Sequence, residues 1–264
     1  MNKFKKVSII ALLLLIVGMV GAIATNNEKQ RQLPVEEIEI KDSNYQQIEL
    51  LTYDAKVELL PTNRANAYIE VTGHKTNKKL SVSVQDSLLF IKYNNKQIKL
   101  FNFNIFQKTE VIKVFLPAKQ YDQIKVSKHD GTLLVEQLEA DQLFINGRDG
   151  LITLKNTKAA QTTIKGNDGI LELEDATGAI SADMKDSVIK MHAKSLQSPI
   201  SLTARDGIIQ LIVADEPENA FINTSIGDGL VSIFGEKNSS KLYGNGETKV
   251  DLKLNDGKIT VKRQ

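Results

Sequence analysis

The chain has 264 residues, of which 41% are hydrophobic and 25% charged, enough for one ordinary core or one elongated repeat array. Its 34 Lys and Arg nearly balance 32 Asp and Glu, and a net charge of +2 gives no broad positive field, so we expect no nucleic-acid partner. The absence of cysteine excludes thiol catalysis, thiolate metal sites and disulfides. Abundant Ile, Val and Thr, with no Trp, favour strands.

The first segment has the features of a membrane anchor. Residues 7–24 form an uncharged apolar run, and three of the six residues before it are lysines. Eighteen helical residues cover about 27 Å, close to the ~30 Å thickness of the hydrocarbon layer. The positive-inside bias keeps the lysines in the cytoplasm, so the remaining chain faces outward. We therefore predict a single-pass protein of the plasma membrane with an extracytoplasmic C-terminal domain. The alternative is secretion after cleavage near Ala24, because Ala22 and Ala24 fit a small-x-small peptidase site.

The chain divides by pattern into four parts. Residues 1–24 are the predicted anchor or signal segment, and the polar residues 25–35 are a predicted linker. Residues 36–120 alternate as strands do, and we expect degenerate outer coils or a flatter capping sheet there. Residues 121–264 are a predicted array of regular β-solenoid repeats.

One motif recurs throughout this last part: a polar residue, then Asp-Gly, then an alternating apolar strand. Its aspartates are spaced by 19, 19, 18, 20, 22 and 28 residues, and a period near 19 is typical of a solenoid. In one copy Ser187 replaces the glycine, and the other glycines are expected to supply the positive φ of a tight corner. The predicted structural turns are Asp130 and Gly131, Asp149 and Gly150, Asp168 and Gly169, Asp186, Asp206 and Gly207, Asp228 and Gly229, and Asp256 and Gly257.

These features predict an all-β fold, a β-solenoid of stacked coils of about 19 residues with Asp-Gly turns, preceded by one N-terminal transmembrane helix. In each strand one face lines a narrow core, as with Ile152 and Leu154 between Leu151 and Lys155. The alternative is an antiparallel β-meander or sandwich, because Asp-Gly between alternating strands is also a hairpin signal. Residues 215–220 and 235–247 are expected to be loops inserted between coils.

Two earlier segments keep the order of Asp, small residue and alternating strand. They are YDAKVELL from Tyr53 and QDSLLFIKY from Gln85, and both are expected to form degenerate outer coils.

The segment VIKVFLPAKQYDQIKVSKHDGTLLVEQL, the recurring DGxIxL units and the closing YGNGETKVDLKLNDGKITV together resemble a known family over residues 45 to 262. It is the adhesin-like β-solenoid family, a domain of unknown function that includes LiaG-like envelope-stress surface proteins. The resemblance implies a membrane-anchored or secreted surface protein with no established catalytic activity. It brings no set of catalytic residues to carry over.

The chain offers no sharp catalytic or metal constellation. A column of aspartates suggests calcium, but only one Asp recurs per unit and Lys or Arg precedes several, so hydrogen bonding within each turn is the simpler interpretation. The three histidines lack metal-ligand spacing. We therefore expect no enzyme, no cofactor and no metal. The candidates for a β-helix glycosidase or lyase, which also read as a solvated strand face, are Glu172, Glu174, Asp175, Lys190 and His192.

The segment LFNFNIF places Phe101 and Phe103 on one face, with Phe106 close by. It is a core strand or end cap on one interpretation and an exposed partner patch on the other. The leading hypothesis for function is a non-enzymatic, adhesin-like or envelope-stress-associated binding protein, with an envelope protein or wall polymer as its partner. The alternatives are a carbohydrate-active β-helix enzyme and a self-assembling surface scaffold.

Overall fold

The computed structural model describes residues 35–72, 80–94 and 110–264. Residues 35–264 form one compact unit, distinct from residues 1–34. The predicted anchor and the three phenylalanines of the predicted patch, Phe101, Phe103 and Phe106, lie outside the described residues. Within the described part, no helix has the length and apolar character needed to cross a membrane.

The described residues form strands and connecting turns, so this part of the chain is all-β. The strands are β1 (Val35–Glu39), β2 (Gln47–Thr62), β3 (Tyr68–Thr72), β4 (Leu80–Gln85), β5 (Leu88–Tyr93), β6 (Val111–Pro117), β7 (Gln120–Glu136), β8 (Glu139–Gly147), β9 (Leu151–Lys155), β10 (Lys158–Lys165), β11 (Gly169–Glu174), β12 (Thr177–Asp183), β13 (Asp186–Ala193), β14 (Ile200–Val213), β15 (Ala220–Ile233), β16 (Ser240–Tyr243) and β17 (Thr248–Arg263).

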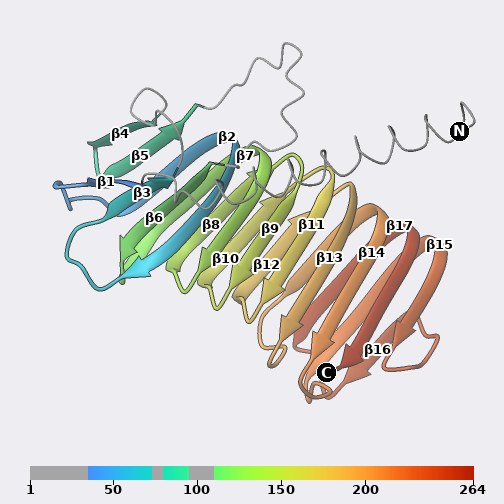
Figure 1. Cartoon of the computed structure of the whole chain (residues 1–264). Coiled ribbons are helices and arrows are strands. Elements are labelled where there is room, and N and C mark those ends of the chain that lie inside the picture. The colour runs from blue at the N-terminus through green and yellow to red at the C-terminus, as the bar shows by residue number, and fades with distance from the viewer. Residues whose placement is uncertain (1–34, 73–79, 95–109) are drawn as a thin grey trace, which may run out of the picture. The chain divides into compact units, whose positions relative to one another are not determined.

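Each regular coil consists of two strand segments joined at an Asp-Gly corner, and the coils stack side by side (Figure 1). Equivalent segments pair in parallel: Glu139 of β8 pairs with Lys158 of β10, 19 residues further on. Leu151 of β9 likewise lies beside Ile170 of β11. This register gives a β-solenoid-like stack, and the alternative of an antiparallel meander is wrong for these coils.

The core lies between the two segments of every coil. In β9 the buried side chains are Ile152 and Leu154, which confirms the predicted alternation. The same alternation buries Ile124 and Val126 in β7. Because stacked coils repeat the pattern in register, the buried side chains form one continuous apolar column along the stack.

The Asp-Gly corners of adjacent coils touch through their backbones. Each corner glycine has positive φ, from 97° at Gly131 to 138° at Gly229. A Cβ at Gly150 would overlap the carbonyl oxygen of Gly131 in the next coil. Ser187 does not have the positive φ of the glycines, and its hydroxyl donates a hydrogen bond to the carbonyl of Asn167 at 2.7 Å.

At its N-terminal end the stack continues through strands distant in sequence. β2 pairs in parallel with β7, so that Asp54 lies beside Asp130. On its other side β2 pairs with β5 and β6, which together form the outermost coil. The expected corner at QDS is wrong: Asp86 and Ser87, both with positive φ, form the turn of an antiparallel β4–β5 hairpin. Antiparallel strands β4, β3 and β1 thus cover this end.

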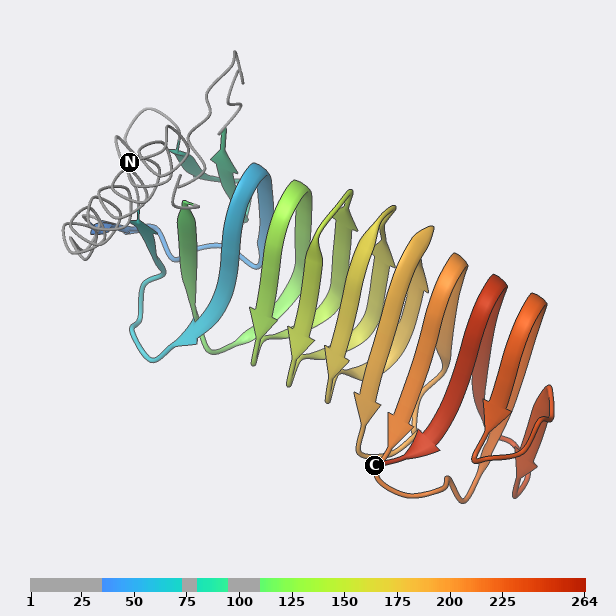
Figure 2. The same ribbon diagram turned by 45° about the vertical axis from the view of Figure 1, so that its right-hand side comes forward.

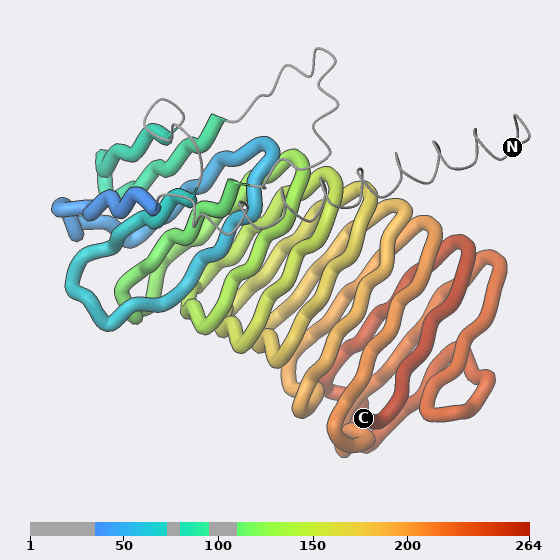
Figure 3. Tube along the Cα trace, in the orientation of Figure 1, coloured from blue at the N-terminus to red at the C-terminus, as the bar shows by residue number. Residues whose placement is uncertain are grey.

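At the C-terminal end the coils do not stack in chain order. Asp256 of β17 pairs with Asp206 of β14 on one side and with Asp228 of β15 on the other. Figures 2 and 3 show the last strand in red, lying between the two orange coils. The first of the two predicted loops lies between β14 and β15, whereas the second contains the short strand β16. After β14 the chain crosses to β15, which lies two coil positions away. It returns through the antiparallel strand β16, and β17 then occupies the position between β14 and β15.

We predict that Gly150→Ala lowers the free energy of unfolding by more than about 2 kcal/mol, because the added methyl group overlaps the neighbouring backbone and the φ of 103° is unfavourable for alanine. Chemical denaturation measures the change. Gly235→Ala is the matched control, since Gly235 also has positive φ but has open space around it, and it should cost about 1 kcal/mol. Equal effects of the two substitutions would contradict corner packing.

The coil order is tested with paired cysteines, because the chain has none of its own. Gln210→Cys with Thr260→Cys joins positions that are direct register partners, and we expect a disulfide to form under mild oxidation. Gln210→Cys with Ser232→Cys should not crosslink, because β17 separates these strands and two coil spacings are about 10 Å. Crosslinking of the second pair alone would indicate stacking in chain order.

Candidate functional site

A groove of about 480 Å³ runs along the Asp-Gly side of the stack, across the coils of β2, β7, β8, β10 and β12. We call it the corner groove. Successive residues of each coil supply one wall, the floor and the other wall. The strand-side wall is Leu51, Ser127, Asn146, Lys165 and Asp183. The floor is Thr52, Lys128, Gly147 and Gly166. The turn-side wall is Tyr53, His129, Arg148, Asn167 and Lys185.

The walls follow from the strand register. Asn146 of β8 pairs with Lys165 of β10, which pairs in turn with Asp183 of β12. On the turn side the amide of Asn167 donates to the carbonyl of Arg148, and the amide of Lys185 donates to that of Asn167. Equivalent atoms therefore repeat about every 4.8 Å, and five coils give the groove a length of about 19 Å.

The floor is main chain, because its residues occupy the inward-facing positions of their strands. At Gly147 and Gly166 a Cβ would lie 2.8 Å from Ile152 Cδ1 and 2.5 Å from Met184 Sδ, respectively. Core side chains thus reach up to the floor, and a side chain at either position would have to displace the flexible end of Ile152 or Met184. Glycine at both positions leaves the floor bare.

Lys128 is the exception among these inward positions, since it brings a charge into the corner. The residue is 6% exposed, and its ammonium donates to the carbonyl oxygens of Gly131 at 3.1 Å and Asp149 at 2.5 Å. Burial lowers the pKa of Lys128, and the carboxylates of Asp130 and Asp149 oppose this shift only in part. A positive charge therefore lies beneath the turn-side wall.

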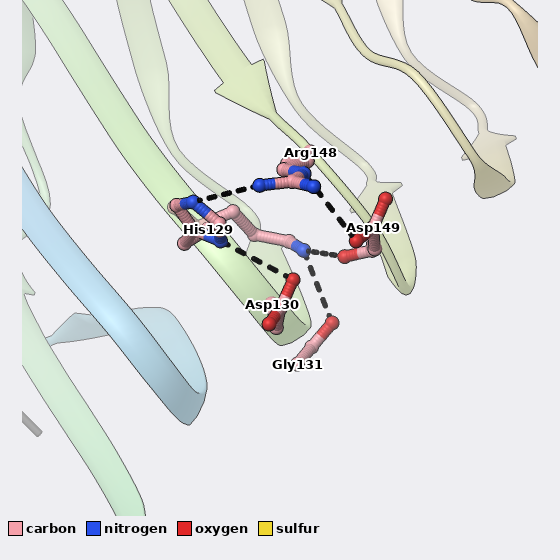
Figure 4. Close-up of polar contacts among 6 residues, drawn as sticks. His129, Asp130, Gly131, Arg148 and Asp149 are labelled. Carbon is pink, nitrogen blue, oxygen red and sulfur yellow. Dashed lines mark hydrogen bonds and ion pairs between the residues drawn. The ribbon is translucent and has the colours of Figure 1, made fainter. Parts of the chain in front are cut away.

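The turn-side wall is a chain of polar contacts (Figure 4). His129 Nδ1 lies 3.4 Å from Asp130 Oδ1, and His129 Nε2 lies 3.3 Å from Arg148 Nη1. Arg148 Nε in turn lies 3.7 Å from Asp149 Oδ2. A neutral His129 satisfies both contacts when Nδ1 donates and Nε2 accepts. Tyr53 stacks on the His129 ring, with centroids 6.3 Å apart.

The pKa of Asp130 ends below its usual value. Burial alone would raise this pKa, but hydrogen bonding and charge interaction with His129, together with hydrogen bonding to neighbouring aspartates, outweigh burial. Asp130 is therefore ionised and holds the imidazole in place.

The groove is electropositive. Its lining contains the cations Lys128, Arg148, Lys165 and Lys185, and Asp183 is the one carboxylate among these residues. Across the described part of the chain, Lys165 and Lys185 have no side-chain hydrogen bond or ion pair. The same region leaves two buried oxygens without a hydrogen-bond partner, Thr52 Oγ1 and Asp149 Oδ1.

The predicted turn aspartates lie along the outer edge of this wall rather than in the groove. Several of them contact basic side chains: Arg205, for example, lies 3.4 Å from Asp186 and 3.8 Å from Asp206. No group of three or more acidic or histidine side chains among the described residues is arranged to hold a metal ion.

The acidic strand candidates lie on the second segments of the coils. Lys190 Nζ is 3.6 Å from Glu172, so these two form an ion pair. Glu174, Asp175 and His192 meet at a separate cavity of about 260 Å³ at the other corner of the stack, where Lys194 pairs with Asp175 at 3.0 Å. The structure thus divides the five candidates between a surface ion pair and this smaller cavity.

The comparison with family models settles the membership of the chain. The model of the Toastrack DUF4097 family matches residues 45–177 and 145–262, which together span most of the sequence. The chain belongs to the Toastrack DUF4097 family. Membership confirms the resemblance to adhesin-like domains of unknown function that the Asp-Gly repeats indicated.

Several solved structures are similar to this Toastrack chain. A candidate cell adhesion protein from Clostridium sporogenes is 13% identical with a TM-score of 0.44, and the match covers 88% of this chain and 100% of that one. A candidate adhesin from Bacteroides fragilis is 13% identical with a TM-score of 0.47, covering 89% and 98%. A candidate lipid-binding protein from Parabacteroides distasonis is 13% identical with a TM-score of 0.38, covering 85% and 96%. No curated protein matches the chain.

Sequence reasoning missed the corner groove of this Toastrack domain. The signal is present in the strand alternation: after Ile124 and Val126 the next inward position is Lys128, and the corresponding positions of the next two coils are Gly147 and Gly166. A lysine and two glycines in an otherwise apolar inward column mark a place where the core stops short of the corner.

We predict that the stability contributed by Lys128 rises with pH. Because its pKa is lowered in the folded chain, the unfolded chain holds more protons at pH values between that pKa and the ordinary lysine value of about 10.4. The free energy of unfolding of the wild type, minus that of Lys128→Met, should therefore increase across this alkaline window. Urea denaturation at a series of pH values measures the difference. Lys165→Met, at an exposed position, controls for the loss of one charge, and a difference that falls with pH would refute the burial effect.

Proposed function

We propose that this Toastrack protein is a non-enzymatic, adhesin-like binding protein, held at the outer face of the plasma membrane by residues 7–24, that binds an envelope component in its corner groove. The observation that carries the proposal is the groove itself: an open, electropositive channel built on a continuous core. Binding residues held by rigid strands need little reordering when a ligand arrives.

The groove chemistry supports binding over catalysis. Hydrolysis of a glycosidic bond by the usual route needs two carboxyl groups about 5 to 10 Å apart, and Asp183 is the one carboxylate in the lining. His129, the obvious general base, has Asp130 and Arg148 on its two ring nitrogens. These side chains can hold a ligand, but they offer no free acid–base pair.

The location of the protein rests on the sequence. The uncharged run of residues 7–24 with lysines before it favours a single-pass anchor, and secretion after cleavage near Ala24 is the other outcome. Both outcomes put the groove outside the cytoplasm, where a wall polymer or envelope protein is the available partner.

The test uses the full chain expressed with a C-terminal tag in a Gram-positive host. Protease added to intact cells should remove the tag, and deletion of residues 7–24 should protect it. Isolated cell walls should retain the solubilised wild-type protein, and Lys165→Ala with Lys185→Ala should reduce the retained fraction several-fold, because both exposed cations line the groove.

The control is Lys258→Ala with Lys262→Ala, which removes two exposed lysines outside the groove. Protection of the tag on intact cells, equal wall retention by both double variants, or release of reducing ends from the walls would each overturn the proposal.

A further inference from the structure

We propose that the ligand of the corner groove is a linear polyanion that lies along the stack axis, with successive phosphate or carboxylate groups on successive coils. This inference rests on the proposed function and names the chemistry of the ligand. It follows from where the cations stand in the groove.

The cations are distributed one per coil and alternate between the two walls. Arg148 lies on the turn-side wall of the β8 coil, Lys165 on the strand-side wall of the β10 coil, and Lys185 on the turn-side wall of the β12 coil. The register between these strands makes the three coils consecutive. Their spacing of about 4.8 Å per coil is shorter than the Debye length of about 8 Å at physiological salt, so their fields add within the groove.

Two of these cations are available for a ligand. Lys165 and Lys185 have no side-chain partner within the described residues, whereas Arg205, on the next coil beyond Lys185, is already paired with Asp186 and Asp206. Asp183 lies on the wall opposite Lys185 and marks the end of the groove. The positive stretch therefore has a defined length, from Lys128 to Lys185.

The buried ammonium of Lys128 adds to the same field from beneath the turn-side wall. Neutral carbonyl oxygens are its hydrogen-bond partners, and the nearby carboxylates of Asp130 and Asp149 offset its positive charge only in part. A cationic ligand is excluded by this arrangement, and a neutral one would leave the cations unused.

The shape of the groove favours a chain over a membrane surface. A channel about 19 Å long and bounded by two rows of side chains admits a single extended polymer. The headgroups of a flat bilayer cannot enter between the walls to reach both rows of cations. Tyr53, stacked on His129, adds an aromatic face at one end, against which a ring of a polysaccharide can pack.

The test measures binding of the full chain, in a non-ionic detergent, to four probes: inorganic polyphosphate, polygalacturonate, neutral dextran and phosphatidylglycerol vesicles. We expect binding to at least one polyanion that weakens steeply with salt, and no binding to dextran. Comparison of the affinities for polyphosphate and polygalacturonate shows whether the groove prefers phosphate or carboxylate groups. Lys165→Glu with Lys185→Glu should weaken binding by at least about tenfold, because the double variant loses two charge-assisted contacts to the ligand.

The matched control is Lys258→Glu with Lys262→Glu, which makes the same change in net charge at exposed lysines outside the groove. It should change the affinity less than about twofold at physiological salt, where a distant charge is screened. Circular dichroism and thermal unfolding show that both variants are folded.

Three results would overturn the inference: no binding to either polyanion, equal losses in the two double variants, or tighter binding to vesicles than to both polymers. If cell walls retain the wild type while both polyanions fail to bind, the proposed function stands and the polyanion is wrong. If cell walls also fail to retain it, both are wrong.

Discussion

The close approach of one Asp-Gly corner to the next is the constraint on which the rest of this structure depends. The carbonyl of Gly131 occupies the space where a side chain at Gly150 would begin, and the same relation holds between Gly150 and Gly169. Corners this close leave no freedom to slip, so every residue is held level with its counterpart one coil away. The core column and the two walls of the corner groove all follow from that register.

Much of this fold could be predicted because its determinants are local. The glycine of each corner and the alternation of Ile152 and Leu154 are readable within ten residues. The order of the last coils is not local, because corners at Asp206, Asp228 and Asp256 carry the same pattern and do not by themselves specify which coils are neighbours. The structure places β17 on one edge of β15 and antiparallel β16 on the other, and these pairings join residues too distant in sequence for a local pattern to predict.

The candidate site was harder to predict for a related reason. Its walls come from residues that are unremarkable singly, a lysine before Gly166 and an arginine before Asp149, and they become a site only when the coils are placed in register. The aspartates are the most visible repeat in the sequence. At the corners, however, several of them pair with neighbouring basic side chains, as Asp186 does with Arg205. Regular repetition identifies scaffold, and the departures from it, such as Lys128, identify the site.

The chain as a whole is nearly neutral, so its charge alone does not predict an anionic ligand. Some cations elsewhere on the surface are matched locally: Lys125 pairs with Glu49 and Lys158 with Glu139, both at 2.8 Å. Exposed pairs of this kind contribute little to stability, but they cancel the field at their own part of the surface. In the groove, by contrast, three consecutive coils each supply a cation to one concave lining that has a single carboxylate at its end. The register that aligns the coils also aligns these charges, and a polymer with regularly spaced anions is the ligand that matches such a row.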